Sequence, residues 1–223
     1  MNNVIAIDGG AGTGKSSTAK LLASRLHTKY LGTGLIYRAA TYYCVLHEVP
    51  LEDEVSVYCA ILQFVEEYQQ GIGLKTDFDP DDVKFYYAGV EISSALRDLE
   101  LTRKVQFVSS NLRARALLVK MQQDIVTEFH EQGIVLEGRD TTDVIAPDAR
   151  VRVILTASSA VRAVRRAKDL GELNVSEIEK KLQERDAKDA EVTSFEAPND
   201  AGIHVIDTSN LTISEVVDKI MLY

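Results

Sequence analysis

The feature that most constrains the fold is a glycine-rich octet near the N-terminus, GGAGTGKS at residues 9–16, which matches the pattern G-x-x-x-x-G-K-[ST]. The apolar run VIAI at residues 4–7 precedes it, and residues 14–27 carry apolar side chains at helical spacing. A strand, a glycine loop and a helix in this order form a phosphate-binding loop (P-loop), in which backbone N–H groups and the positive end of the helix dipole surround phosphates. The sequence therefore predicts a nucleoside triphosphate site formed by Gly9, Gly10, Ala11, Gly12, Thr13, Gly14, Lys15, Ser16 and Ser17.

Two P-loop side chains have expected roles of their own. The Lys15 ammonium should reach the β- and γ-phosphate oxygens, and the Ser16 hydroxyl should ligate Mg²⁺. The loop does not identify the group that receives the phosphate, because GTPases, motor ATPases and small-molecule kinases all contain one. The rest of the chain must identify the acceptor.

Short apolar runs alternate with helical patterns along most of the chain. Strands are expected at residues 4–7, 30–31, 133–136, 151–155 and 204–206. Helices are expected at residues 14–27, 158–170, 176–190 and 213–222, the last two beginning with the capping boxes Ser176/Glu179 and Thr212/Glu215. This alternation predicts an α/β fold, a doubly wound parallel sheet of five strands flanked by helices.

The middle of the chain departs from this alternation. Between residues 71 and 92 apolar residues recur at every second position, and the acidic stretch 77–82 and the pair Ala88-Gly89 interrupt them as turns. Period-2 runs between turns predict a small antiparallel meander inserted into the α/β core. The following stretch, 98–132, predicts one long helix or two abutting helices.

Composition bounds the class of protein. The chain has 223 residues, enough for one large domain, with 25 Lys and Arg against 34 Asp and Glu and a net charge of −9. That acidic balance disfavours binding along a nucleic acid, which requires neutralisation of many phosphates. No apolar run approaches the ~18 residues of a membrane-spanning helix, and the N-terminus lacks the basic region of a signal peptide. We expect a cytoplasmic monomer that binds neither nucleic acid nor membrane, with Cys44 and Cys59 as buried free thiols.

Several arginines stand where phosphate contacts are expected. Arg38 follows the glycine turn after the second apolar run, and Arg139-Asp140 follows the strand at 133–136. The carboxyl ends of parallel strands are where open α/β sheets bind ligands, and the planar guanidinium suits phosphate oxygens. Further candidates share helical faces at i, i+3 and i+4 spacing: Arg162, Arg165 and Arg166 on one helix, and Arg185 with Asp189 on the next. Solvated or ion-paired surface side chains are expected for Arg103, Arg113, Arg115, Arg150 and Arg152.

At this point the sequence resembles the bacterial cytidylate (CMP) kinases, nearly from end to end. The motifs that carry the resemblance are GGAGTGKSS, TGLIYR, EISSALR, EGRD, RAVRR and ERDAKDAE. The resemblance implies a P-loop nucleoside monophosphate kinase that transfers the γ-phosphoryl group of ATP to CMP or dCMP with Mg²⁺, giving ADP and CDP or dCDP. It implies a single kinase domain over 1–223, with a core of 1–32 and 98–223, an acceptor-binding region with the small sheet at 33–97, and a mobile helical lid at 158–192.

The resemblance also assigns roles to residues. Lys15 and the lid arginines Arg162, Arg165 and Arg166 are implied as catalytic, with Ser16 at the metal. The implied contacts to CMP are Thr33, Arg38 and Arg139 at the acceptor phosphate, Tyr37, Arg185 and Asp189 at the sugar, and Ser93, Arg97 and Asp140 at the cytosine edge. A carboxylate beside cytosine is chemically sensible, because it accepts from the exocyclic amine.

Three positions differ from the family pattern. Gly32 stands where the family usually has Asp, Thr142 where it has Gly, and Val192 where it has an Arg that contacts the acceptor phosphate. Two alternatives therefore stay open beside the CMP kinase. One is an ATP-binding protein with decayed phosphotransfer and a structural or regulatory role, and the other is a kinase for a different small acceptor.

Overall fold

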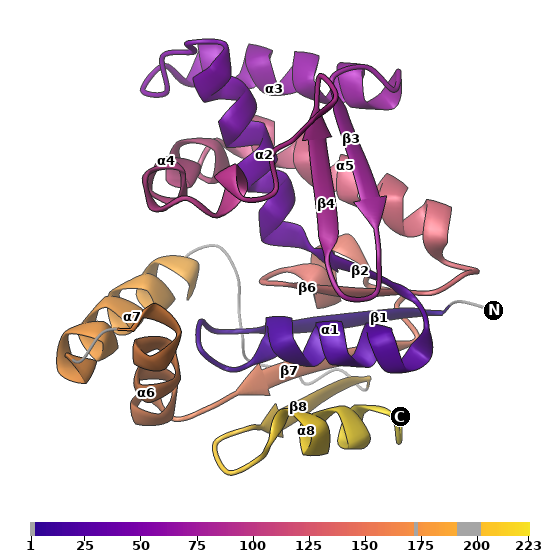
Figure 1. Cartoon of the computed structure of the whole chain (residues 1–223), viewed down its shortest axis with the longest axis vertical. Coiled ribbons are helices and arrows are strands. Elements are labelled where there is room, and N and C mark those ends of the chain that lie inside the picture. The colour runs from indigo at the N-terminus through magenta and orange to yellow at the C-terminus, as the bar shows by residue number, and fades with distance from the viewer. Residues whose placement is uncertain (1–2, 172–173, 191–201) are drawn as a thin grey trace.

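The computed structural model describes residues 3–171, 174–190 and 202–223. The predicted α/β architecture is confirmed: five parallel strands form one sheet in the order β2-β6-β1-β7-β8 (Figure 1). Their bounds are β1 Val4–Gly9, β2 Lys29–Gly32, β6 Ile134–Gly138, β7 Val151–Thr156 and β8 Ile203–Asp207. All five agree in place with the strands expected from the sequence.

Strand β1 lies at the centre of this sheet, between β6 and β7. Its apolar run is buried because helices cover the sheet, and the P-loop leaves its carboxyl end. Helix α1 (Lys15–Leu26) follows the loop and packs on β6 beside α8 (Ile213–Ile220) (Figure 1). The predicted capping box of α8 is confirmed, since Thr212 Oγ1 accepts from Glu215 N at 3.3 Å and Glu215 Oε2 accepts from Thr212 N at 2.8 Å.

The predicted meander is also confirmed. It is a separate three-stranded sheet of β3 (Leu74–Phe78), β4 (Val83–Tyr87) and β5 (Val90–Glu91), antiparallel throughout. The stretch expected as one or two helices forms two, α4 (Leu99–Ser109) and α5 (Leu112–Phe129). The chain breaks between them at Asn111, whose side chain caps α5 by accepting from Ala114 N.

Two helices were not expected from the sequence, α2 (Thr33–Leu46) and α3 (Glu54–Gln69). Helix α2 packs against α4, and α3 packs against α5, so these four helices and the small sheet form an upper lobe above the large sheet (Figure 1). The boundary at residue 97 stays a prediction, and in space α4 and α5 adjoin the elements of 33–97. Helix α2 also places the start of the TGLIYR motif in its first turn.

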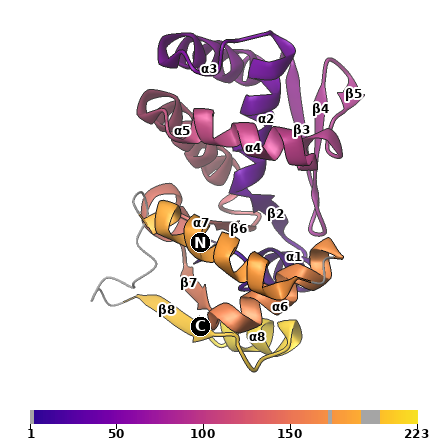
Figure 2. The ribbon, with the colours of Figure 1, turned by 90° about the vertical axis from the view of Figure 1, so that its left-hand side faces the viewer.

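The predicted lid helices are α6 (Ser159–Leu170), which ends at the C-cap Gly171 with φ +67°, and α7 (Val175–Ala190). Figure 2 shows them as a pair below α4 and in front of the large sheet. They share a small core of Ala163, Ala167, Ile178 and Leu182, separate from the main core. The capping box expected at Ser176 is wrong, because Asn174 Oδ1 accepts from Glu177 N at 3.2 Å and the helix starts one residue earlier.

The two cysteines differ in environment. Cys44 is buried in α2, as expected, and burial raises the pKa of its thiol to about 11. Cys59 is exposed on α3, which corrects the expectation that both thiols are buried. Its neighbours in sequence are apolar, but the helix turns position 59 toward solvent. Among the described residues, no helix is both long enough and apolar enough to cross a bilayer.

Candidate active site

The P-loop glycines meet two different demands. Gly9 has φ +150°, and a Cβ there would lie 2.4 Å from Leu155 O on the neighbouring strand. Gly12 has φ +78°, and its Cβ would lie 2.9 Å from Arg162 O on α6. Both positions therefore need glycine for backbone conformation and for close approach of another segment. The second contact brings α6 directly against the phosphate loop.

The N-terminus of α1 is suited to an anion. Its N-cap is Gly14, with φ +87°, and no side chain caps the first turn. The leading N–H groups of the helix, with the dipole behind them, are the donors that P-loops offer to phosphate. Thr13 Oγ1 donates to Gly10 O at 2.9 Å and so braces the loop from inside.

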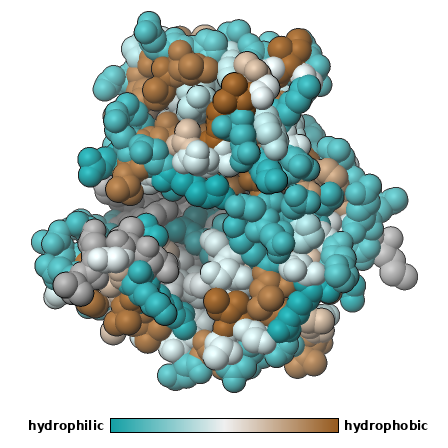
Figure 3. Space-filling model, in the orientation of Figure 1, coloured by the Kyte–Doolittle hydropathy of each residue, from teal (hydrophilic) through white to brown (hydrophobic). Residues whose placement is uncertain are grey.

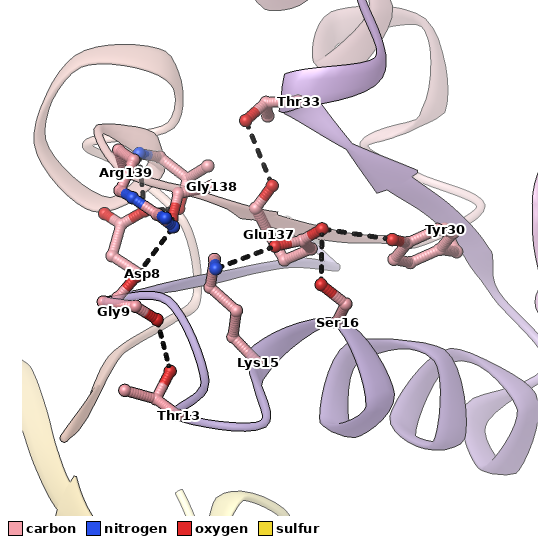
Figure 4. Close-up of polar contacts among 12 residues, drawn as sticks. Asp8, Gly9, Thr13, Lys15, Ser16, Tyr30, Thr33, Glu137, Gly138 and Arg139 are labelled. Carbon is pink, nitrogen blue, oxygen red and sulfur yellow. Dashed lines mark hydrogen bonds and ion pairs between the residues drawn. The ribbon is translucent and has the colours of Figure 1, made fainter. Parts of the chain in front are cut away.

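Glu137, the last side chain of β6 before Gly138, is the centre of the polar contacts in Figure 4. Its Oε2 lies 3.8 Å from Lys15 Nζ, in an ion pair whose side chains are 11% and 12% exposed. Its Oε1 accepts from Ser16 Oγ at 3.0 Å and from Tyr30 OH at 3.2 Å. Glu137 belongs to the EGRD motif, but the sequence predicted no role for it. The one available signal was a carboxylate at the carboxyl end of an expected strand, where open α/β sheets bind ligands.

The donor set fits a magnesium ion. The Ser16 hydroxyl and the Glu137 carboxylate supply adjacent oxygen atoms, and hard oxygen ligands are what Mg²⁺ takes. No cluster of three or more His, Cys, Asp or Glu occurs among the described residues. This matches sites in which one or two protein ligands share the ion with substrate phosphates and water.

Asp8, at the end of β1, holds the segment that follows β6. Its carboxylate is 2% exposed and accepts four hydrogen bonds, from the backbone N–H and the hydroxyl of both Thr141 and Thr142. Thr142, one of the three departures from the family pattern, therefore has a structural role, because its hydroxyl donates to Asp8 Oδ2 at 2.7 Å. Asp8 fixes the turn that carries Arg139 and Asp140.

Asp140 forms a buried ion pair with Arg115 of α5. Asp140 is 4% exposed, and burial raises the pKa of its carboxyl above the ordinary value while the Arg115 guanidinium opposes that rise. Arg115 was expected to be a solvated or ion-paired surface side chain; it is ion-paired, but with a buried partner, because the helix turns it toward the sheet edge. The pairing depends on a contact across 25 residues of sequence.

Tyr37 points its hydroxyl into the same region. Burial raises its pKa to about 12, and the charges of Arg115 and Asp140 both act on the hydroxyl. The hydroxyl oxygen is buried and makes no hydrogen bond of good geometry within the described part of the chain, although the Gln122 side chain also acts on it. A buried polar atom of this kind is unusual in proteins. Tyr37, Arg115 and Asp140 therefore line one polar corner.

Arg97 and Ser93, both expected beside Asp140, form hydrogen bonds with residues of the small sheet and its turn. Arg97 makes two hydrogen bonds to the Asp82 carboxylate, at 2.8 and 2.9 Å, and a third to Ser93 O. Ser93 is buried and accepts from Phe85 N at 3.0 Å. Asp82 also lies 3.1 Å from Lys20 Nζ, so it links the tip of the small sheet to α1. The roles of Ser93 and Arg97 at the cytosine edge stay predictions.

The residues expected at the acceptor phosphate occupy two places. Thr33 Oγ1 donates to Glu137 O at 3.0 Å, and Arg139 Nη1 donates to Gly9 O at 2.9 Å, so both lie beside the P-loop (Figure 4). Gly138 must remain glycine, because its Cβ would lie 2.2 Å from Thr33 Oγ1. Arg38 lies farther out, where Nη1 donates to Leu96 O at 2.8 Å and to Thr102 Oγ1 at 2.7 Å.

The lid arginines reach different targets. Arg162 Nη1 donates to Ala11 O of the P-loop at 3.3 Å, whereas Arg165 donates to Thr208 Oγ1 and O at 3.0 and 2.7 Å. Thr208 in turn donates to Thr13 O at 3.0 Å, so Arg165 is connected to the P-loop through Thr208.

Arg166 lies on the same helix, partly buried. Arg185 and Asp189 lie on α7 at positions whose side chains are not described, and Val192 lies outside the described residues.

The surface is hollowed between the upper lobe and the α6–α7 pair (Figure 3). The P-loop, the end of β6 and the start of α2 all open on that side of the sheet (Figure 1). The arrangement can hold a nucleoside triphosphate at the P-loop and a second, smaller phosphate compound near the corner of Tyr37, Arg115 and Asp140. Phosphoryl transfer between two such ligands needs positioning and charge stabilisation more than covalent chemistry.

Comparison with known proteins agrees with this geometry. Residues 5–223 match the family model described as cytidylate kinase. A cytidylate kinase of Streptomyces avermitilis is 35% identical over 219 residues, covering 98% of this chain and 90% of the relative. A cytidylate kinase of Listeria innocua is 34% identical over 226 residues, covering 97% and 93%. An uncharacterised protein from Eubacterium ventriosum has a similar fold, with a TM-score of 0.55 at 12% identity, covering 100% of this chain and 98% of that one.

Proposed function

The chain belongs to the cytidylate kinase family, and from this premise we propose that it transfers the γ-phosphoryl group of ATP to CMP and dCMP. The observation that carries the proposal is the proximity of two polar centres at the carboxyl ends of β1 and β6. One is the P-loop with Lys15 and Ser16 around Glu137, and the other is the buried pair Arg115–Asp140. The first suits a triphosphate, and the second suits a base with both donor and acceptor groups.

On the donor side, the P-loop N–H groups and the Lys15 ammonium bind the ATP phosphates. Ser16 and Glu137 would hold Mg²⁺, which supplies positive charge at the phosphate oxygens when bound. Arg139 and Arg162, both hydrogen-bonded to P-loop carbonyls, bring further positive charge toward the group in transfer. Stabilisation of charge by preorganised cations is the main catalytic contribution in this type of reaction.

On the acceptor side, Asp140 and Arg115 read the base. The carboxylate accepts from the exocyclic amine of cytosine, and the guanidinium donates to its ring nitrogen and carbonyl oxygen. Tyr37 offers its buried hydroxyl to the sugar or phosphate of the same nucleotide. Asp8, through Thr141 and Thr142, keeps Asp140 in place by fixing the turn that carries it. The enzyme acts as a monomer in this proposal.

A coupled ADP-release assay across CMP, dCMP, UMP, AMP and GMP tests the proposal. We expect turnover with CMP and dCMP and much weaker turnover with the purine monophosphates. ATP binding without transfer to any of the five would support decayed phosphotransfer instead. A clear preference for another acceptor would support a different kinase.

The Asp140→Asn variant tests base reading. Uracil carries an acceptor oxygen where cytosine carries its amine, so the carboxylate should disfavour UMP, whereas an amide can donate to it. The ratio of kcat/KM for CMP to that for UMP should fall by about 10- to 100-fold, the range of one charge-assisted hydrogen bond.

Asp124→Asn is the matched control. It removes the carboxylate of an exposed side chain on α5 that pairs with Lys120, and should leave that ratio unchanged. A wild-type enzyme with equal kcat/KM for CMP and UMP would contradict the assignment.

A further inference from the structure

Tyr30 is a second strand residue that reaches Glu137. Strands β2 and β6 are neighbours, with Gly32 opposite Glu137 and Tyr30 opposite Val135 in the register. Tyr30 and Glu137 are therefore diagonal neighbours across two parallel strands, and the tyrosine hydroxyl donates to Glu137 Oε1 at 3.2 Å. That same oxygen accepts from Ser16 of the P-loop. One carboxylate oxygen of Glu137 thus accepts hydrogen bonds from helix α1, which follows the P-loop, and from strand β2.

The tyrosine is fixed in place. Its side chain is 2% exposed, and Lys20 Nζ lies over the ring, 5.3 Å from its centroid. Burial and the adjacent Glu137 charge raise the pKa of the hydroxyl above its ordinary value.

Gly32 provides a second, independent observation. Its φ of −81° and ψ of 106° are available to any residue, so the backbone does not require glycine. However, a Cβ at this position would lie 2.8 Å from Tyr30 OH and 3.0 Å from Glu137 Oε1. The absence of a side chain at position 32 is what lets the hydroxyl and the carboxylate meet.

These contacts also act on the Lys15–Glu137 ion pair. Two hydrogen bonds hold Oε1 toward Ser16 and Tyr30, while Oε2 stays 3.8 Å from Lys15 Nζ. Charge-assisted ion pairs between nitrogen and oxygen close to 2.7–2.9 Å when nothing restrains them. A carboxylate freed from Tyr30 would move onto Lys15 and compete with ATP phosphates for the ammonium.

We propose that Tyr30 is a positioning residue of the donor site: its hydroxyl restrains the Glu137 carboxylate, keeps Lys15 available to the ATP phosphates, and requires glycine at position 32. The inference rests on the proposed function for its effect on turnover. Its effect on ATP binding does not depend on which acceptor is used.

The central experiment compares Tyr30→Phe with Tyr43→Phe. Tyr43 is a matched control in the upper lobe, because it is also 2% exposed and its hydroxyl donates to a glutamate, Glu67, at 3.0 Å. Titration calorimetry with ATP in EDTA measures the competition for Lys15 without metal. We expect ATP affinity to fall about 3- to 10-fold in Tyr30→Phe and less than twofold in Tyr43→Phe.

Kinetics and thermal melting separate positioning from stability. Tyr30→Phe should raise KM for ATP and lower kcat while KM for CMP stays unchanged, and both phenylalanine variants should lose similar thermal stability. Equal ATP affinity in wild type and Tyr30→Phe, or equal losses in the two variants, would overturn the proposal. Failure of transfer to CMP in the wild type would contradict the proposed function and leave the ATP-binding comparison valid.

A double variant tests the role of Gly32. Gly32→Ala should weaken ATP binding in the wild-type background by displacing the hydroxyl and the carboxylate. In the Tyr30→Phe background, Gly32→Ala should change the logarithm of the ATP dissociation constant by less than half as much. The reason is that the tyrosine hydroxyl, which the alanine Cβ would meet at 2.8 Å, is gone. Additive losses in the double variant would show that Gly32 is required for some other reason.

Discussion

Lys15→Ala should retain less than about a tenth of wild-type turnover, and we expect a loss of about 10²–10³-fold. Lys15 is the only cation within residues 9–17, and the charge on a transferring phosphoryl group requires neutralisation where it develops. The nearby arginines reach the loop through its carbonyl oxygens and cannot take the place of an ammonium that arises from the loop itself. The coupled ADP-release assay with CMP measures the effect.

Lys120→Ala is the control for this variant. Lys120 is 67% exposed on α5 and pairs with Asp124, and its removal should leave turnover within twofold of wild type. Thermal melting of Lys15→Ala beside wild type shows whether the variant is folded under the assay conditions, so that lost turnover can be assigned to the active site. Turnover above a tenth of wild type in Lys15→Ala would mean that the P-loop has been assigned the wrong role.

Arg115→Met should lower the free energy of unfolding by about 3–5 kcal/mol, the usual cost of leaving one partner of a buried pair without its counter-charge. Asp140 is 4% exposed and would keep its carboxylate in a poorly solvated place. The variant should also raise KM for CMP by at least about tenfold, because the guanidinium is a proposed contact to the base. Chemical denaturation and steady-state kinetics measure the two effects.

The loss of stability in Arg115→Met should depend on pH in a definite direction. Burial already raises the pKa of Asp140, and Arg115 is the charge that opposes the rise, so the variant should raise it further. A carboxyl whose pKa is higher in the folded state favours folding more when it is protonated. The deficit in stability relative to wild type should therefore be largest at neutral pH and shrink as the pH falls through the raised pKa.

Arg113→Met is the control on the same helix. Arg113 is exposed, with its guanidinium carbon 3.7 Å from the centroid of the Tyr58 ring, and such an exposed contact contributes only about 0.5–1 kcal/mol. A deficit for Arg115→Met no larger than that of Arg113→Met, at every pH, would show that the buried pair contributes nothing to stability.

Local patterns predicted most of the fold. The strand before the P-loop, the amphipathic helix after it and the period-2 runs of the small sheet each carry their own signal, and all were confirmed. Helix α2 was missed because more than one of its faces is buried, so that no single polar face reveals the helical period. The start of α7 was misplaced by one residue because Asn174 and Ser176 are both good caps, and the chain uses the first.

The site was less predictable, because its pairs form across the fold. Arg115 sits in the sequence LRARA and looks like a surface arginine until α5 meets the turn after β6. Glu137 could be recognised only once β1 and β6 were known to be adjacent, which places its carboxylate beside Lys15. Arg97 bonds to Asp82, an acidic partner that the sequence did not identify, and its expected role at the base stays a prediction.

The small core shared by α6 and α7 makes this pair a separate unit of cooperativity. Local opening costs less where few apolar side chains are buried, and the described side chains of this core are two alanines, one isoleucine and one leucine. The main core around the large sheet contains none of these residues. Ala11 packs against that small core from within the P-loop, so the boundary between the two units runs through the phosphate site itself.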